Sequence, residues 1–205
     1  MSGVISTYDE LVAELTDYMI HDEAADNIPG FIRLAESQFE SVLRVREMER
    51  RVTYMIGSED LTVPTDFLEA RSFVLTDSGV KLEYESIDTL EARKSSTGNP
   101  CFFTIWGEEL LVYPEAASDS PVKASFRYTG RMQPLSPSAP VNSVLTNYPD
   151  IYLYGALTHS AGYLKDPNMQ GQWGAMFTAS IDNANKAARK IVGQRLQMTP
   201  SGAPV

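Results

Sequence analysis

The chain has 205 residues, of which 43% are hydrophobic and 21% are charged, the balance of an ordinary globular protein with enough apolar material for a core. Its formal net charge of −10 disfavours a sequence-wide attraction to nucleic acid or to an anionic membrane. A single cysteine excludes an internal disulfide, and two histidines fit no standard zinc pattern.

Targeting signals are not evident in the sequence. No apolar run approaches the length of a membrane span, and the first residues lack the basic-then-apolar pattern of a signal peptide. We therefore expect synthesis in a reducing cytoplasm and no membrane association.

The first fifty residues are predicted to be helical. Thr7 and Glu10 have the spacing of a capping box, and apolar residues follow at helical intervals. A second helix is expected to start at Asn27-Ile28-Pro29, because proline is tolerated in a first turn. Its apolar stripe consists of Ile28, Ile32, Ala35, Phe39 and Leu43.

From residue 51 to residue 131 the pattern changes to that of strands. Gly107-Glu108 separates two apolar runs as a hairpin turn would, and a short helix is expected at 86–94. Runs that alternate, or that are rich in β-branched and aromatic residues, predict strands at 51–56, 71–76, 80–85, 101–106, 109–114 and 122–130.

Two more helices are predicted after a loop rich in proline and serine. The first, from Asn147 to Leu164, is apolar or aromatic on nearly every side, which is typical of a buried helix. The last ten residues, from Leu196 to Val205, indicate a flexible tail. The second helix carries one apolar face, made of Trp173, Phe177, Ile181, Ala184, Ala188 and Ile191.

These elements predict an α+β fold, in which a helical bundle is formed by N- and C-terminal helices and a mostly antiparallel β domain of about six strands is inserted. The expected parts are the N-terminal helices at 1–50, the inserted β domain at 51–131, the C-terminal helices that complete the bundle at 146–195, and the flexible tail at 196–205.

Charge is distributed unevenly along the chain. The first thirty residues carry seven acidic residues and no Lys or Arg. From Lys165 onward the sequence contains five basic residues and only two acidic ones. The two ends could pair within a chain or between chains. Solvated helix faces and a favourable interaction with a helix dipole explain the same pattern.

No motif in the sequence predicts catalysis, a cofactor or a metal. There is no phosphate-binding loop, no G-x-S-x-G turn and no H-E-x-x-H pair. Cys101 is interpreted as a small core thiol, and His159 as a satisfied core or interface histidine rather than a proton-transfer group. The strand-region acids are interpreted as solvated faces rather than as a glycosidase pair; they are Glu83, Glu85, Glu108 and Glu109.

The densest basic stretch is LRVREMERR, from Leu43 to Arg51. Its arginines could contact phosphates, but two glutamates interrupt them, and ion pairing explains the stretch at least as well. A DNA-binding module centred on Arg44 to Arg51 remains one alternative function. A carbohydrate-binding or glycan-hydrolysing β domain, with Trp106 or Tyr113 as a stacking platform, is another.

An ordered series of segments resembles the head-to-tail adaptor (neck or connector) proteins of tailed bacteriophages. The series runs IPGFIRLAESQFESVLRVREMERRVTYMI, LTVPTDFLEARSFVL, LEYESIDTL, GNPCFFTIWGEELLVYPEA, FRYTGRMQPLS and NSVLTNYPDIYLYGALTHSAGYLKD. It spans residues 28–181 or so, most of the chain.

The resemblance implies a non-enzymatic virion protein made in the host cytoplasm and located at the neck. Such proteins form a ring, usually twelvefold, beneath the portal protein, where they extend the DNA channel and dock the tail or nozzle protein. Genomic DNA would pass through without sequence-specific binding.

Two sets of contact residues follow as predictions. We expect the subunit interface of the ring to use Tyr148, Tyr152, Leu157, His159, Tyr163, Arg44 and Arg46. C-terminal segments of similar proteins reach the portal, so portal docking is assigned to Leu196, Met198, Pro200 and Val205.

Overall fold

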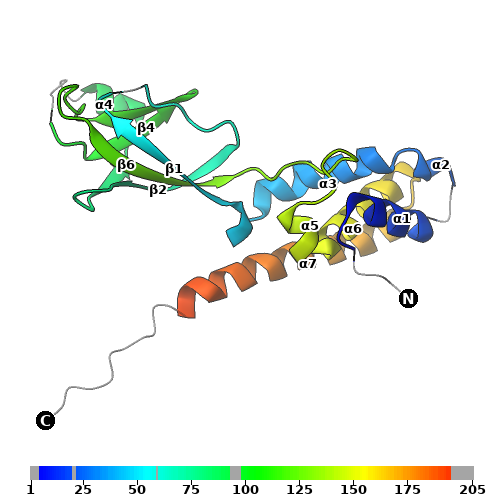
Figure 1. Cartoon of the computed structure of the whole chain (residues 1–205). Helices are drawn as coiled ribbons and strands as arrows, with labels where there is room; N and C mark the ends of the chain where they lie inside the picture. The colour runs from blue at the N-terminus through cyan, green and yellow to red at the C-terminus, as the bar shows by residue number, and fades with distance from the viewer. Residues whose placement is uncertain (1–4, 20–21, 59, 93–97, 195–205) are drawn as a thin grey trace, which may run out of the picture. The chain divides into compact units, whose positions relative to one another are not determined.

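The computed structural model describes residues 5–19, 22–58, 60–92 and 98–194 (Figure 1). The chain divides into two compact units. Unit 1 comprises residues 1–47 and 132–205, and unit 2 comprises residues 48–131. Unit 1 is helical and unit 2 contains the strands, so the protein has the expected α+β composition.

Unit 1 contains helices from both ends of the sequence. Two short helices, α2 and α5, were not predicted, and the long apolar helix starts at Pro149 rather than at Asn147. The elements are α1 (Tyr8–Tyr18), α2 (Asp22–Ala25), α3 (Ile28–Val42), the 3-10 turn η1 (Arg46–Met48), α5 (Ser143–Asn147), α6 (Pro149–Tyr163) and α7 (Pro167–Gln194).

The predicted start of α1 is confirmed by its hydrogen bonds. The backbone N–H of Glu10 donates to Thr7 Oγ1 at 3.3 Å, and the N–H of Thr7 donates to the Glu10 carboxylate at 3.0 Å. This reciprocal capping box satisfies backbone donors that have no partner inside the helix.

The predicted apolar stripe of α3 is also confirmed. All five residues of the stripe are buried, none more than 2% exposed. Because residues three and four apart share one face of a helix, the stripe directs α3 onto its neighbours in unit 1.

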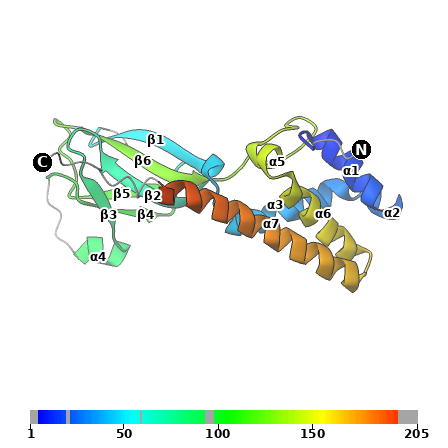
Figure 2. The same ribbon diagram turned by 90° about the horizontal axis from the view of Figure 1, so that it is seen from below.

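Helix α6 contacts four other helices of unit 1, namely α1, α3, α5 and α7 (Figure 2). Helices α3 and α7 both pack closely against α6 at Gly155, because a Cβ atom there would lie 2.8 Å from the Ala35 Cβ on α3 and 2.9 Å from the Phe177 ring on α7. A larger residue would push these helices apart. Neighbours within the same chain thus explain much of the apolar character of α6.

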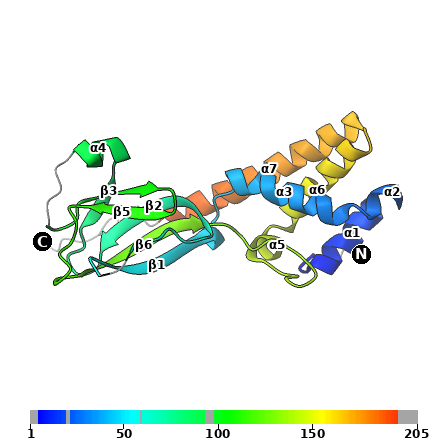
Figure 3. The same ribbon diagram turned by 90° about the horizontal axis from the view of Figure 1, so that it is seen from above.

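Unit 2 is a six-stranded mixed sheet with the strand order β1-β6-β2-β3-β4-β5 (Figure 3). Among the described strands only β3 and β4 pair in parallel, and the β4–β5 hairpin turns at Gly107, whose φ of 61° suits glycine. The elements are β1 (Glu49–Ile56), β2 (Phe67–Leu75), β3 (Lys81–Tyr84), α4 (Ile87–Ala92), β4 (Phe102–Trp106), β5 (Glu109–Tyr113) and β6 (Val122–Gly130).

The core of unit 2 is an aromatic cluster centred on Phe126. This side chain is fully buried, and its ring centroid lies 5.3 Å from that of Phe73 and 6.3 Å from that of Phe103. Tyr54, Phe67 and Tyr128 complete the set of rings around it. Large rings in edge-to-face and stacked contacts make this the main source of apolar burial in the sheet.

Candidate interaction surfaces

The residues predicted to lie at a subunit interface fall into three groups by burial: two are buried, two are exposed, and Arg44, Tyr148 and His159 are half-buried. Tyr152 and Leu157 are only 0% and 2% exposed, because other helices of the same chain cover them. Tyr163 is 53% exposed, and Arg46 is also exposed. In this conformation an interface with a second copy could use the exposed members of the set but not the two buried ones.

The buried Tyr152 hydroxyl belongs to a polar network that the sequence did not reveal. It donates to Glu36 Oε1 at 2.9 Å and accepts from Asn142 Nδ2 at 2.7 Å. The N–H of Leu135 donates to the same Glu36 oxygen at 2.7 Å. The network therefore ties the proline-rich loop to both α3 and α6.

Two groups of this network, the Glu36 carboxyl and the Tyr152 hydroxyl, have raised pKa values. Burial raises the pKa of Glu36, against the lowering effect of its two hydrogen-bond donors. Burial and the nearby Glu36 carboxylate raise the pKa of Tyr152 far above its usual range, so the hydroxyl stays a donor. A groove of about 420 Å³ borders the network and is also lined by Arg33, Glu40 and Pro134.

His159 is half-buried on α6. Its Nε2 atom is buried and makes no hydrogen bond with any described residue, so this chain alone does not satisfy it, and its place in a core or an interface stays a prediction. Burial lowers its pKa, which favours the neutral imidazole. The remaining interface candidate on this part of the chain, Tyr148, is half-buried, and burial together with Glu47 raises its pKa.

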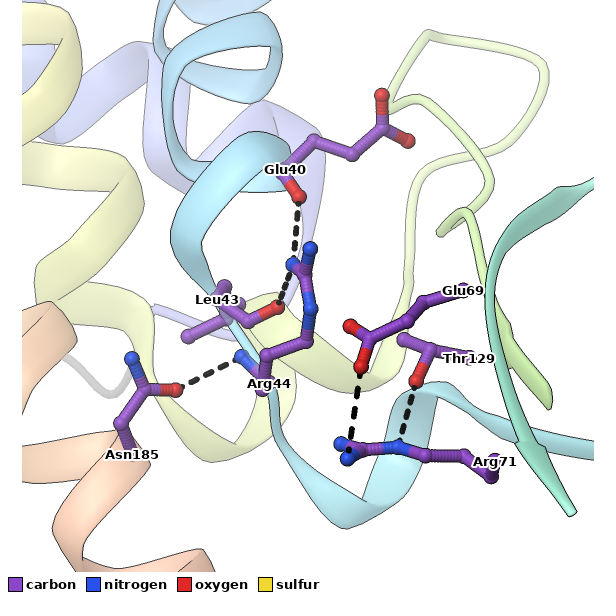
Figure 4. A network of polar contacts seen from close by, with 7 residues as sticks. All are labelled: Glu40, Leu43, Arg44, Glu69, Arg71, Thr129 and Asn185. Carbon is purple, nitrogen blue, oxygen red and sulfur yellow. Dashed lines mark hydrogen bonds and ion pairs between the residues drawn. The ribbon is translucent and has the colours of Figure 1, made fainter. Parts of the chain in front are cut away.

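Arg44 and its neighbours fix the end of α3 to α7 (Figure 4). The Arg44 guanidinium donates to the backbone carbonyls of Glu40 and Leu43, at 3.1 and 2.7 Å. The backbone N–H of Arg44 donates to the Asn185 side chain at 2.7 Å, and that side chain donates to the carbonyl of Val42 at 3.1 Å. Arg44 therefore serves the local structure of unit 1.

Figure 4 also shows an arginine network inside unit 2. Arg71 Nε donates to Thr129 Oγ1 at 3.1 Å, and its guanidinium lies 3.7 Å from the Glu69 carboxylate. Both charged side chains are almost half exposed, so the ion pair adds little stability.

The residues of the carbohydrate alternative lie on the strands and turns of unit 2. Trp106 is 59% exposed at the end of β4, whereas Tyr113 on β5 is half-buried. Glu83, Glu108 and Glu109 are exposed, as solvated acids are, and Glu85 is half-buried. Across the described residues no group of three or more His, Cys, Asp or Glu could hold a metal ion.

Cys101 corrects a prediction. Its thiol is exposed and donates to the carbonyl of Asn99 at 3.4 Å, so it is not a core thiol. The residue precedes β4, which starts at Phe102, and within that strand only Phe103 and Thr104 are buried.

An aromatic surface on α1 and α7 was not identified from the sequence. Tyr18, which is 47% exposed, meets Trp173 edge to face with ring centroids 6.0 Å apart, and Tyr154 stacks on Trp173 at 5.9 Å. Met169 and Met176 flank Trp173 on α7 and are 42% and 43% exposed. Exposed aromatic and methionine side chains are typical of protein contact surfaces.

The predicted portal-docking residues lie outside the described residues, as does His21. They are Leu196, Met198, Pro200 and Val205. No helix in the described ranges is long and apolar enough to cross a membrane.

The comparisons with known proteins agree with the resemblance seen in the sequence. No curated protein matches the chain. Residues 6–200 match the family described as SU10 adaptor protein, which covers almost the whole chain, including both units. The chain therefore belongs to the SU10 adaptor protein family and is a bacteriophage head-to-tail adaptor.

Proposed function

We propose that the protein assembles as a ring of twelve copies beneath the portal, where it extends the DNA channel and docks the tail or nozzle. The observation that carries this proposal is the family match over residues 6–200. Membership in this family implies a structural role at the virion neck and interaction with portal and tail proteins.

The two units would have different roles in the ring. We assign ring formation to a helical bundle made by the helices of unit 1, and the contact with the tail or the outer rim to unit 2. Exposed aromatic and methionine residues on α1 and α7 support a protein contact by unit 1. The boundaries at 1–50, 51–131, 146–195 and 196–205 are part of the same proposal.

The net charge of −10 supports passage of DNA rather than a tight grip on it. Acidic surfaces that face a channel repel the phosphate backbone, which lets the duplex slide. No sequence-specific DNA contact is part of the proposal.

Residues 196–205 are proposed to dock on the portal. Deleting Leu196 to Val205 should leave both units folded but weaken binding to the portal of the same phage, measured by co-sedimentation with portal rings. Undiminished binding by the truncated protein would refute the proposed role of residues 196–205.

The function is tested with DNA-filled heads that lack the protein. Adding the purified protein should allow tails or nozzles to attach, and images of the heads should show a ring beneath the portal. Heads that gain neither a ring nor a tail would overturn the proposal.

A further inference from the structure

Helix α7 is much longer than its partner α6, with 28 residues against 15. Three glycines show that the two helices are antiparallel in one constant register. A Cβ atom at Gly162 would lie 3.0 Å from the Gln170 side chain, one at Gly174 would lie 3.7 Å from Thr158, and one at Gly155 would lie 2.9 Å from Phe177.

This register places Pro149, the first residue of α6, level with Asn183. Residues 184–194 of α7 therefore continue beyond the end of α6, by about 16 Å at the rise of an α-helix. Asn185 is hydrogen-bonded to the C-terminal end of α3, through Val42 and the Arg44 that follows the helix. Figure 1 shows the red end of α7 running past the yellow α6.

The projecting segment carries a basic patch, defined here as Lys186, Arg189 and Lys190. All three side chains are exposed, and their spacing places them on one side of the helix. None makes a hydrogen bond or ion pair within the described part of the chain. The nearest acid on α7, Asp182, lies one turn earlier, so the patch remains net positive.

A surface of opposite charge lies on α1. Asp9 and Asp17 are exposed there, and Glu14 is half-buried between them. Helix α1 contains no basic residue, and Glu10 is engaged in the capping box. On α7, Trp173 contacts Tyr18 of α1, more than three turns before the basic patch begins.

We propose that the basic patch of α7 docks on the acidic side of α1 in a neighbouring copy of the chain. The proposal rests on the ring described above, and it names the surfaces that meet there. A ring interface joins two different faces of the same protein. This chain carries a basic face on α7 and an acidic face on α1. Complementary charges would fix which face meets which and would guide association.

Charge reversal tests the pairing on portal rings of the same phage. One variant carries Lys186→Glu, Arg189→Glu and Lys190→Glu, a second carries Asp9→Lys and Asp17→Lys, and a third combines all five changes. The measurement is the number of copies bound per portal ring, by native mass, as protein concentration and salt are varied.

Each single-sided variant should need about tenfold more protein than wild type to fill the ring at low salt. The combined variant should recover most of that loss, because the charges again match. The wild-type contact should weaken as salt rises, since both patches are exposed.

A matched control changes the same amount of charge on unit 2. Lys81→Glu, Lys123→Glu and Arg127→Glu are exposed positions on strands, and this variant should fill the ring as wild type does. Because Asp9 lies in the first turn of α1, where a positive charge disfavours the helix, Asp17→Lys alone provides a second, milder test.

Three outcomes would overturn the pairing. Filling by the α7 variant at wild-type concentrations would show that the basic patch is not in the interface. A combined variant that does no better than the α7 variant would assign the patch to the portal or to DNA instead. A ring that forms but ignores both sets of changes would reject the pairing while leaving the proposed function intact, whereas failure of the wild type to bind the portal at all would reject the function.

Discussion

The cores of the two units are built on different principles. Unit 2 is stabilised by aromatic rings packed around Phe126. The hydroxyl of its buried Tyr128 donates a hydrogen bond to Asp66 Oδ1 at 2.8 Å. In unit 1 the helices surround α6, and a hydroxyl, a carboxylate and an amide meet at Tyr152. Apolar burial thus dominates one unit, whereas the other also depends on every partner of a polar network being present.

The chain carries one tryptophan in each unit, which allows the two cores to be followed separately. Trp106 lies in unit 2 and Trp173 in unit 1, and the sequence has no other tryptophan. Fluorescence in a Trp106→Phe background reports unit 1, and in a Trp173→Phe background it reports unit 2.

The largest effect is expected from a charge in the centre of unit 1. Leu157→Asp places a carboxylate at a site that is 2% exposed, which should cost about 4 kcal/mol or more and abolish soluble assembly. Urea denaturation, followed by Trp173 fluorescence in the Trp106→Phe background, measures the loss of stability. Leu157→Met, which keeps an apolar side chain of similar volume, is the control. An unchanged Trp173 transition in the Asp variant would contradict the central position of α6.

The next effect concerns the aromatic cluster. Phe126→Ala should lower the stability of unit 2 by about 3–5 kcal/mol, because it opens a cavity among buried rings. The Trp106 transition in urea is the readout, and Val80→Ala, at a site 44% exposed, is the control. A loss no larger than that of the control would mean that Phe126 is not the centre of this core.

A smaller effect separates the polar network from simple packing. Tyr152→Phe keeps the ring but removes the hydroxyl, so Glu36 and Asn142 each lose a bond, and unit 1 should lose about 1–3 kcal/mol. Tyr163→Phe removes an exposed hydroxyl on the same helix and should be almost neutral. Equal stability of the two variants would argue against the network.

The smallest effect is a dependence on pH. Because burial lowers the pKa of folded His159, the unfolded chain binds the proton more readily, and unit 1 should lose stability as pH falls below about 6.5. The raised pKa of Glu36 acts in the opposite direction, since its contribution to stability is lost as pH rises through the folded value.

His159→Gln isolates the first of these terms. The difference between wild type and variant in the urea midpoint at Trp173 should change between pH 7 and pH 5.5, with the wild type losing more. A constant difference across that range would contradict the assigned effect of burial on His159.

Local patterns in the sequence were sufficient for most elements of the fold. The α3 stripe and the Thr7 cap depend on residues within a few turns, and the strands depend on alternation within four to nine residues. The short helix α5 was missed, although Asn142 caps it by accepting from the N–H of Leu145, a signal present in the sequence.

Long-range contacts could not be read in the same way. Glu36 and Tyr152 are 116 positions apart, and nothing near either residue indicates the other. The aromatic character of α6 was interpreted as partly due to other copies, yet its own chain buries Tyr152 and Leu157. Periodicity shows that a helix is covered but does not show by what.

The central proposal is that this adaptor forms its ring on the portal. The most direct test is the mass of the purified protein, alone and after mixing with the portal of its own phage. The account predicts a smaller species alone and a stoichiometric ring on the portal. A protein whose mass does not change when the portal is added would contradict it.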